Sequence, residues 1–520
     1  MKKKVVSLLM AGAMVLSLLA GCGGSGDSGK TPDSGKENNV TEGKTKPATT
    51  GKADNSFTTV VTDQVTTFDP QLFALQCEDS VIVQLYDPLF YVKNDGTIDK
   101  VLLESYTENE DGSVDFVLKS GVKFHSGDVL TAEDVEYTLS RCENSALCSP
   151  LFGTIVMEIE DETHFTWQFP YADQGASFAD LTAYIQGMCI VNKSYCENVI
   201  SDPNENLGFN VDGTGAYYYD SKTSTGDVTL KRFADYHGTV SIDTLYFKYV
   251  SGSQELAFEA GDIDYAVYTA TNYELIKEYS NVNAYNQPLN NVGFLILNCV
   301  EGKATSDIRV REAIARCLNR EDICSVATSD AGTVAYNLAG ALCNYYDDVC
   351  DHFDLDVEKA NNLMTEAGYS ASNPLELTLI CMSAYPDWVS ACEIMKEELE
   401  QSYFTVKIEE VADTSRYFTG DFDMGMISVG LTSQFASYSV LFDTSTGMNL
   451  AGYEEPDVLE AFAAIKDEET THNAMKVATE SLAYIPLFYP TIFLAFDADV
   501  EPGDFYIGIN TFLYREFAWK

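Results

Sequence analysis

The chain has 520 residues, of which 45% are hydrophobic and 22% are charged, so it can form several folded units with hydrophobic cores, and global disorder is excluded. Its 80 acidic and 32 basic side chains give a formal net charge of −48. Binding to nucleic acid needs clustered Lys and Arg side chains that neutralise phosphates. This charge therefore argues against nucleic acid as a partner and is more compatible with a neutral or cationic ligand.

The N-terminus has the pattern of an export signal followed by a cysteine for lipid attachment. A positive segment, Lys2 to Lys4, precedes an apolar run from Val5 to Ala20 that is short for a membrane-spanning helix. The sequence Leu19-Ala20-Gly21-Cys22 resembles the lipobox of bacterial lipoproteins. This resemblance implies a signal peptide over residues 1–21 and a stable two-chain lipid anchor on Cys22. We therefore expect the protein at the cell membrane, lipid-anchored on the extracytoplasmic face, at the cell surface or in the periplasm.

Residues 22–55 form a low-complexity segment that is rich in Gly, Ser, Lys and Thr and has no aromatic residue. Such a composition cannot bury enough apolar surface to fold, so we predict a disordered tether. Within it, Gly24 to Thr31 match the spacing of a Walker A motif. A phosphate-binding loop needs a strand before it and a helix after it, so a motif inside a tether does not predict nucleotide binding.

After the tether, strand-like and helix-like patterns alternate along the chain. Segments 57–61 and 114–119 are expected to form strands. Helices are expected to begin at Thr131, near Asp307 and at about Asp356, where a side chain able to cap the helix precedes an amphipathic pattern. This mixture predicts lobes of the α/β class.

The cysteines have the pattern of buried thiols. Thirteen cysteines less Cys22 leave twelve, with no C-x-x-C pair, and several of them lie in apolar contexts. Cys142 with Cys148, and Cys343 with Cys350, are spaced closely enough to pair, but spacing does not establish a disulfide. We expect none.

The sequence contains no recognisable catalytic motif. It has no G-x-S-x-G and no H-E-x-x-H, and its five histidines include no pair at i, i+4 spacing. His125 precedes the predicted helix at Thr131, in a turn, and is expected to have a structural role. We therefore expect a protein that is not an enzyme and has no cofactor and no metal site.

A series of short motifs along the chain has a recognisable order and spacing. The longest motifs are Gly121–Val135 (GVKFHSGDVLTAEDV), Asp307–Ile323 (DIRVREAIARCLNREDI) and Asp356–Tyr369. Shorter ones are Thr67–Pro70, Tyr86–Phe90, Gly213–Tyr217, Ala260–Asp264 and Ile485–Leu487. In their order and spacing these motifs resemble one family, the peptide/nickel class of ABC-transporter solute-binding proteins (dipeptide/oligopeptide-binding, family 5). The resemblance extends from about Phe57 to the C-terminus.

This resemblance implies an α/β, two-lobed periplasmic-binding-protein-like fold of the class II type, in a large variant with an extra subdomain, and a ligand cleft between the lobes. Lobe I would comprise residues 56–295, with a subdomain inserted at about residues 85–200. Lobe II would comprise residues 296–487, and residues 488–520 would return to lobe I. The chain would cross between the lobes near residues 294–298 and 486–490, and these two crossings would form a hinge.

The function that the resemblance implies is the extracytoplasmic, lipid-anchored solute-binding component of an ABC importer. Such a protein captures oligopeptides by domain closure and delivers them to the permease and ATPase complex. We expect a monomer. Two alternatives are left open: the same fold binding a nickel chelate, haem or another small solute, and a lipoprotein sensor without transport.

The residues that the resemblance places in the cleft wall are Gln64, Val65, Tyr268, Thr269, Asn291, Phe294, Ser428, Gln434 and Tyr489. The chain departs from the family at Ile427–Tyr438, where relatives carry Trp-x-x-Asp-Tyr-x-x-Pro. In peptide-binding relatives this aspartate pairs with the free α-amino group of the ligand. The corresponding sequence here is ISVGLTSQFASY, so recognition of a free peptide N-terminus is left open.

Overall fold

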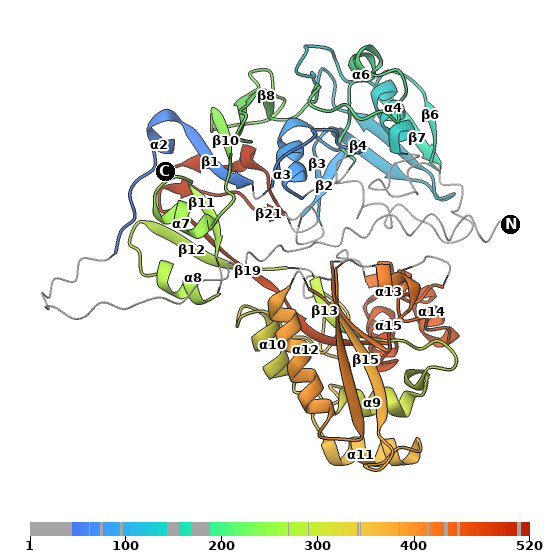
Figure 1. The fold of residues 1–520 in the computed structure, drawn as a ribbon. Helices are drawn as coiled ribbons and strands as arrows, with labels where there is room; N and C mark the ends of the chain where they lie inside the picture. The colour runs from blue at the N-terminus through green and yellow to red at the C-terminus, as the bar shows by residue number, and fades with distance from the viewer. Residues whose placement is uncertain are drawn as a thin grey trace, which may run out of the picture.

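The computed structural model describes residues 44–61, 63–72, 76–93, 97–142, 155–168, 188–268, 270–289, 291–340, 343, 345–383, 385–412, 415–430, 435–444, 448–506 and 511–520. These residues form two α/β lobes, drawn one above the other in Figure 1. The predicted export signal and Cys22 lie outside the described residues. None of the helices that the structure describes has the length and apolar character needed to cross a lipid bilayer.

Lobe I, the upper one in Figure 1, is built around two sheets. One has the strand order β1-β10-β9-β8 with a parallel β1–β10 pair, and the other has the antiparallel order β11-β19-β12. The strands are Ser56–Val61 (β1), Tyr217–Lys222 (β8), Val228–Arg232 (β9), Thr244–Tyr249 (β10), Tyr265–Tyr268 (β11), Val282–Pro288 (β12) and Thr491–Asp497 (β19).

Short helices and small hairpins complete this lobe. The helices are Gly51–Asp54 (α2), Gln76–Leu85 (α3), Gln254–Glu259 (α7) and Ala270–Ile276 (α8), with a 3-10 turn at Tyr514–Glu516. The hairpin strands are Phe90–Val92 (β2) with Ile98–Lys100 (β3), Val500–Glu501 (β20) with Ala518–Trp519 (β23), and Phe505–Tyr506 (β21) with Thr511–Phe512 (β22). The C-terminal residues therefore lie in lobe I.

A third sheet of lobe I, with its own hydrophobic core, lies within the predicted insertion. Its strand order is β4-β5-β7-β6, and every neighbouring pair is antiparallel. Phe116 of β5 packs on Phe165 and Trp167 of β7, with ring centroids 5.2 Å and 4.8 Å apart. The elements are Leu103–Glu108 (β4), Val114–Leu118 (β5), Val156–Ile159 (β6), His164–Gln168 (β7), Ala132–Cys142 (α4) and Lys193–Val199 (α6).

Lobe II is one mixed sheet with helices on both faces. The strand order is β14-β18-β13-β17-β15-β16. The strands are Asn291–Leu297 (β13), Thr333–Val334 (β14), Leu375–Met382 (β15), Phe404–Val411 (β16), Met424–Gly430 (β17) and Tyr484–Tyr489 (β18). The helices are Ile308–Ala315 (α9), Arg320–Ala327 (α10), Val357–Glu366 (α11), Pro386–Leu399 (α12), Ser415–Thr419 (α13), Pro456–Ala463 (α14) and Glu468–Glu480 (α15), with 3-10 segments at Ala304–Ser306 and Phe435–Leu441 (η4).

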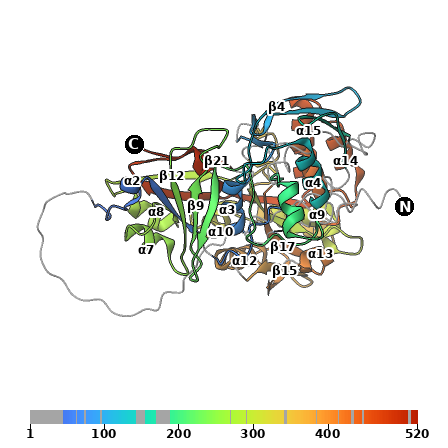
Figure 2. The ribbon, with the colours of Figure 1, turned by 90° about the horizontal axis from the view of Figure 1, so that it is seen from above.

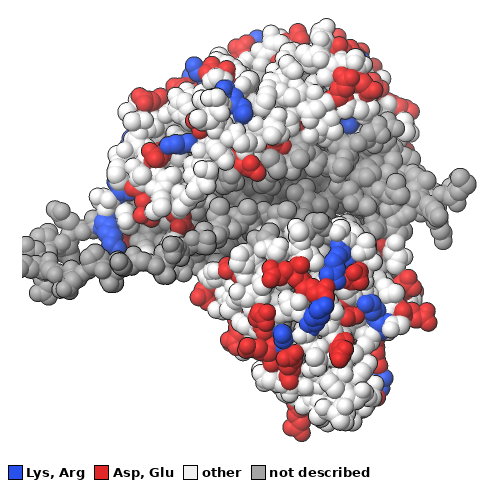
Figure 3. Space-filling model, viewed as in Figure 1, with Lys and Arg blue, Asp and Glu red and all other residues white. Residues whose placement is uncertain are grey.

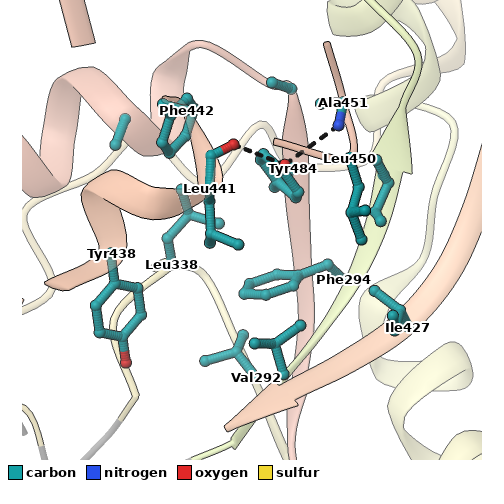
Figure 4. Packing of buried hydrophobic residues seen from close by; sticks show 14 of the residues in the cluster. Val292, Phe294, Leu338, Ile427, Tyr438, Leu441, Phe442, Leu450, Ala451 and Tyr484 are labelled. Atoms are coloured by element: carbon teal, nitrogen blue, oxygen red, sulfur yellow. Dashed lines mark hydrogen bonds between the residues drawn. The ribbon is translucent and has the colours of Figure 1, made fainter. Parts of the chain in front are cut away.

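The two faces of this sheet carry separate hydrophobic cores. Side chains of α9, α10, α11 and α12 pack on one face, and side chains of η4, α14 and α15 pack on the other. Figure 4 shows the second core, in which the Tyr484 hydroxyl donates to the Leu441 carbonyl and accepts from the Ala451 amide, at 2.8 Å and 3.2 Å. A sheet buried on both faces explains the continuous apolar runs of β13 and β18.

Local predictions agree with the structure where a few neighbouring residues decide the conformation. The predicted strands at 57–61 and 114–119 are β1 and β5. The side chain of Asp307 caps α9 by accepting from the Arg309 amide at 2.9 Å, and that of Asp356 caps α11 by accepting from the Lys359 amide at 2.9 Å. Thr131 directly precedes α4 and donates its amide to the Asp134 carboxylate at 2.9 Å.

The end of the predicted tether is part of the fold. Lys46 is buried and lies 2.7 Å from an Asp497 carboxylate oxygen of β19. Helix α2 packs so closely that a Cβ on Gly51 would lie 2.6 Å from the Trp519 ring. Composition did not reveal this because the contacts are made with residues more than 200 positions further along the chain. We call residues 44–55 the N-terminal arm.

The first crossing between the lobes also differs from its expected position. All of β13, from Asn291, pairs with β17 in the lobe II sheet, whereas β12, up to Pro288, belongs to lobe I. The crossing therefore lies between residues 288 and 291 rather than at 294–298. The return crossing lies between Tyr489 of β18 and Thr491 of β19, within a few residues of its expected place.

Candidate functional site

The candidate site is the edge of the lobe II sheet that faces lobe I. β13 begins at this edge, just after the first crossing, and β18 ends at it, just before the second. Because β17 is antiparallel to β13 and parallel to β15, the carboxyl ends of β15, β16, β17 and β18 all lie at this edge. In α/β folds, ligands bind outside the carboxyl ends of the strands.

Three of the predicted ligand residues lie at this edge. Asn291, the first residue of β13, stands opposite Gly430, the last residue of β17. Tyr489, the last residue of β18, stands opposite Thr333 of β14. Ser428 lies two residues before the end of β17. The structure thus brings together Asn291, Ser428 and Tyr489, which are far apart in the sequence.

Tyr489 belongs to a chain of hydroxyl groups. Its hydroxyl donates to the Asn337 carbonyl at 3.1 Å and lies 3.3 Å from the Tyr346 hydroxyl. Because Tyr489 uses its proton on Asn337, Tyr346 is the donor of the second bond. Burial raises the pKa of Tyr489 far above its usual value, so this phenol stays neutral. Of the two tyrosines, Tyr346 is 37% exposed and is therefore the one that a ligand can reach.

Ser428 has a buried hydroxyl for which the described part of the chain supplies no hydrogen-bond partner. Its neighbours Ile427 and Val429 point into the core shown in Figure 4, so Ser428 points to the other face of the sheet, on the side of α12. A buried polar group without a partner costs free energy. Ser428 Oγ is therefore an unsatisfied polar atom just inside the candidate edge, enclosed by protein atoms in this structure.

Two aromatic residues at this edge were missed by the sequence analysis. Tyr385 precedes α12 and Trp388 lies in its first turn, and their ring centroids are 4.4 Å apart. The start of α12 lies at the same edge because this helix follows β15. Both rings are partly exposed, and because their planes are inclined by 31° they form an angled apolar surface. The sequence feature that could have revealed them is a pair of aromatic residues three positions apart, with a proline between them, just after an apolar strand.

The predicted residues of lobe I make contacts within that lobe. The Gln64 side-chain amide donates to the Thr225 carbonyl at 3.0 Å, in the turn between β8 and β9. Val65 is buried in the lobe I core. Tyr268 ends β11, is buried, and donates its hydroxyl to the Glu255 carbonyl at 3.4 Å. Of these three, Gln64 is partly exposed. Thr269 and Gln434 lie outside the described residues.

Phe294 was expected in the cleft wall, and the structure places it in the core of lobe II instead. Its side chain has 0% exposure, and its ring centroid lies 5.9 Å from that of Tyr484 (Figure 4). The reason is its position three residues inside β13, where the strand alternation points it toward η4 and α14. Val65, which was also expected in the cleft wall, packs in the hydrophobic core of lobe I.

Charged side chains and potential metal ligands are scattered over the described part of the chain and do not cluster at one site. On the face shown in Figure 3, acidic side chains are scattered over both lobes and outnumber basic ones. Within the described ranges, no group of three or more His, Cys, Asp and Glu side chains is placed to hold a metal ion. The Cys343 thiol donates to the Tyr438 hydroxyl at 3.2 Å and Cys350 to the Met475 carbonyl at 3.7 Å, so these two cysteines are not joined to each other.

Comparison with known proteins identifies one family. The profile described as "Bacterial extracellular solute-binding proteins, family 5 Middle" matches residues 97–449, which is more than half of the chain. The chain is 28% identical to the "Dipeptide-binding protein" of Escherichia coli (strain K12) over 343 residues, which are 60% of this chain and 63% of that protein. The chain therefore aligns with less than two thirds of the length of this curated relative.

Solved structures share the fold over a larger part of the chain. The ABC transporter substrate-binding protein CtaP from Listeria monocytogenes superposes with a TM-score of 0.78 at 20% identity, covering 89% of this chain and 99% of that one. NikA from Brucella suis, solved in complex with Fe(III)-EDTA, also has a TM-score of 0.78, at 19% identity, covering 89% of this chain and 100% of that one. The predicted two-lobed fold, the family resemblance and the prediction of a binding protein rather than an enzyme are confirmed.

Proposed function

The chain belongs to the bacterial extracellular solute-binding proteins of family 5, and from this premise we propose that it is the lipid-anchored, extracytoplasmic component of an ABC importer that captures oligopeptides. It acts as a monomer, encloses its ligand by domain closure, and delivers the ligand to a permease and ATPase complex. Cys22 carries the lipid anchor, and the residues before the N-terminal arm serve as the tether.

The observation that carries this proposal is the pair of crossings between the lobes. Both of them, at residues 288–291 and 489–491, adjoin the lobe II edge that holds Asn291, Ser428 and Tyr489. Rotation about two adjacent backbone segments moves the lobes toward each other across this edge. A transporter can then distinguish the ligand-bound, closed form from the open form, because ligand binding shifts the population between them.

Oligopeptides fit the chemistry of this edge. It offers a partly exposed neutral hydrogen-bonding residue, Tyr346, beside the rings of Tyr385 and Trp388, whose centroids lie 4.4 Å apart. Such groups bind a polar backbone and apolar side chains without selecting one sequence. The relative from Escherichia coli is a dipeptide-binding protein, which supports the same ligand class. Ligand residues carried over from the family, Thr269 and Gln434 included, complete the proposed cleft wall.

Binding of a metal chelate, haem or another small solute is the second candidate. The observation that favours it is the likeness to the NikA structure, which was solved with Fe(III)-EDTA. No three metal-ligating side chains gather among the described residues, so a metal would have to arrive already chelated. A sensor without transport would bind the same ligands and differ in its partner.

Native mass spectrometry tests the ligand class. The protein from Gly23 onward, which retains every described residue, is purified gently, and the molecules that co-purify with it are released and sequenced. A ladder of peptide masses is the expected result, and the peptide lengths show whether the free N-terminus is bound. A single non-peptide mass, or a protein whose melting temperature no peptide library changes, would overturn the peptide assignment.

The anchor and the transport partner need separate tests. Cys22→Ser in the full chain should move the protein from the membrane fraction to the soluble fraction, while peptide binding is unchanged. Uptake of a bound peptide by cells should stop when the gene is deleted and return with the wild-type chain. Peptide binding without any effect on uptake would favour the sensor.

A further inference from the structure

Asp387 is an exposed carboxylate at the lobe II edge. It lies in the first turn of α12, and in the sequence it stands between the two aromatic residues of that edge, Tyr385 and Trp388. α12 begins at the edge and lies beside α10 in both views of the ribbon (Figure 1 and Figure 2). A ligand that enters between the lobes can therefore reach this carboxylate.

A hydrogen bond sets the direction in which the Asp387 carboxylate points. Its Oδ2 accepts from the Ser329 hydroxyl at 2.8 Å. Ser329 belongs to the turn between α10 and β14, three residues before Gly332, and a Cβ on Gly332 would lie 2.8 Å from the Tyr489 carbonyl oxygen. Asp387 therefore points from α12 toward the turn that adjoins the end of β18.

Two accessible aromatic rings lie next to this carboxylate in the same helical turn. The Tyr385 and Trp388 rings are both partly exposed, and the Trp388 ring is supported from below by the buried Phe488 of β18, with centroids 6.4 Å apart. The face of an aromatic ring attracts a cation, and tryptophan attracts it most strongly. A carboxylate beside two such rings has the chemistry that binds an ammonium or guanidinium group.

Basic residues are absent from most of the segments that form this edge. The chain has no Lys or Arg in the stretches that contain both crossings, the turn between α10 and β14, the start of α12 and the ends of β17 and β18, namely residues 278–302, 321–358, 360–395, 417–465 and 477–514. Arg416, which follows β16, is held by Glu409 at 2.6 Å. Among the described residues, Asp387 forms no ion pair with Lys or Arg, so its charge is available to a cation of the ligand.

We propose that Asp387 determines the specificity of the cleft by pairing with an ammonium or guanidinium group of a bound oligopeptide, an inference that rests on the proposed function. The rings of Tyr385 and Trp388 cover the apolar stem that carries this group. The cation is a Lys or Arg side chain or the free amino terminus of the peptide, which share one chemistry. The selection is local to one carboxylate and is distinct from the attraction exerted by the net charge of the whole protein.

Four alanine pentapeptides serve as probes. Three of them are acetylated and amidated and carry Lys, Gln or Glu at the centre, and the fourth carries Gln and a free amino terminus. Isothermal titration of the protein from Gly23 onward is done at physiological ionic strength, which screens charges more than about 8 Å away. The Lys peptide or the free-amino peptide should bind about tenfold more tightly than the blocked Gln peptide, and the Glu peptide should bind most weakly. The peptide that gains affinity identifies the source of the cation.

Variants assign the preference to Asp387. Asp387→Asn keeps an oxygen that accepts from Ser329 but removes the charge, so the preference should fall to about twofold or less. Its control, Glu376→Gln, removes an exposed carboxylate at the start of β15, six residues and about 20 Å from the end of that strand, and should keep the preference.

Tryptophan fluorescence locates the bound peptide. The chain has three tryptophans, and two of them, Trp167 and Trp519, lie in lobe I. Binding of the preferred peptide should change the emission of the wild-type protein, and this change should be lost in Trp388→Phe, which keeps an aromatic ring at the edge.

Two results would overturn the proposal and leave the peptide function in place. One is equal affinity for all four peptides, and the other is an equal loss of the preference in Asp387→Asn and Glu376→Gln, which would assign it to the net charge. Binding of none of the four also overturns it, and a non-peptide mass in the native spectrum then shows that the peptide function fails as well. If Asp387→Asn does not fold, the wild-type affinities and the Trp388→Phe fluorescence still decide whether a cation is selected at this edge.

Discussion

The carboxyl groups of Asp264 and Asp497 lie close together beneath the N-terminal arm. Asp264 accepts from the Thr58 amide at 2.6 Å, while Asp497 accepts from the Thr49 hydroxyl at 3.1 Å and lies 2.7 Å from Lys46 Nζ. Burial, and to a smaller extent the negative charge of Asp497, raise the pKa of Asp264 to about 7. Folding therefore favours the protonated form of Asp264.

This pKa makes the stability of lobe I depend on pH. An aspartate in an unfolded chain has a pKa of about 4, so between pH 4 and pH 7 the folded protein holds more protons than the unfolded chain. The contribution of Asp264 to the free energy of unfolding is therefore greatest below pH 4, falls as the pH rises to 7, and is constant above. At about 1.4 kcal/mol per pKa unit, a rise of about three units gives an upper limit of about 4 kcal/mol.

Asp264→Asn removes this dependence. The amide keeps the shape of the protonated carboxyl, accepts from the Thr58 amide through its oxygen, and donates toward Asp497 through its nitrogen. At pH 8 we expect the free energy of unfolding of the variant to exceed that of the wild type by about 2–4 kcal/mol, and the variant should unfold at a higher temperature. This difference in free energy should shrink steadily as the pH falls to 4.5.

Thermal and urea unfolding of both proteins between pH 4.5 and pH 8 measure this effect. The control is Asp262→Asn, which removes an exposed carboxylate from the same turn together with its ion pair to Lys248 at 3.6 Å. The control should change the free energy of unfolding by less than about 1 kcal/mol at every pH. Parallel pH profiles for Asp264→Asn and the wild type would refute the reasoning.

Three further predictions concern packing, a buried ion pair and ligand charge. Gly293→Ala places a Cβ 2.4 Å from the Phe488 ring, so urea unfolding should show a loss of about 1–3 kcal/mol, whereas Gly252→Ala, with nothing within 4 Å, should be nearly neutral. Asp69→Asn leaves Arg141 buried without its ion-pair partner, 2.6 Å away, and should cost about 3–5 kcal/mol; a loss below about 1 kcal/mol would contradict this. Because the net charge is −48, Lys-rich peptides should bind more tightly than matched Glu-rich ones at low salt, and equal affinities would disprove it.

Features that depend on a few neighbouring residues could be predicted from the sequence. Asp307 and Asp356 cap their helices because each side chain reaches an amide two or three positions ahead. The motif order around these helices identified the family and the two-lobed fold. For the candidate site, the resemblance predicted ligand contacts at Asn291, Ser428 and Tyr489, and the structure places these three residues near the ends of β13, β17 and β18, at one edge of the lobe II sheet.

The direction in which each side chain points could not be predicted in the same way. Phe294 lies three residues from Asn291, but the alternation of β13 turns it into the core under η4 and α14. Ser428 turns away from that core, and the glycine opposite it, Gly293, leaves space for the Phe488 ring. These outcomes depend on the register between strands that are more than 100 residues apart, which no local pattern encodes.

The sequence by itself determined the fold class, the helix caps and the family, because these follow from residue types within short windows and from the order of motifs. The tertiary structure alone decided that residues of the N-terminal arm pack against β19, and that His125 Nδ1 is buried without a partner among the described residues. Each of these depends on contacts between distant segments, and burial then sets the energetic weight of each polar group.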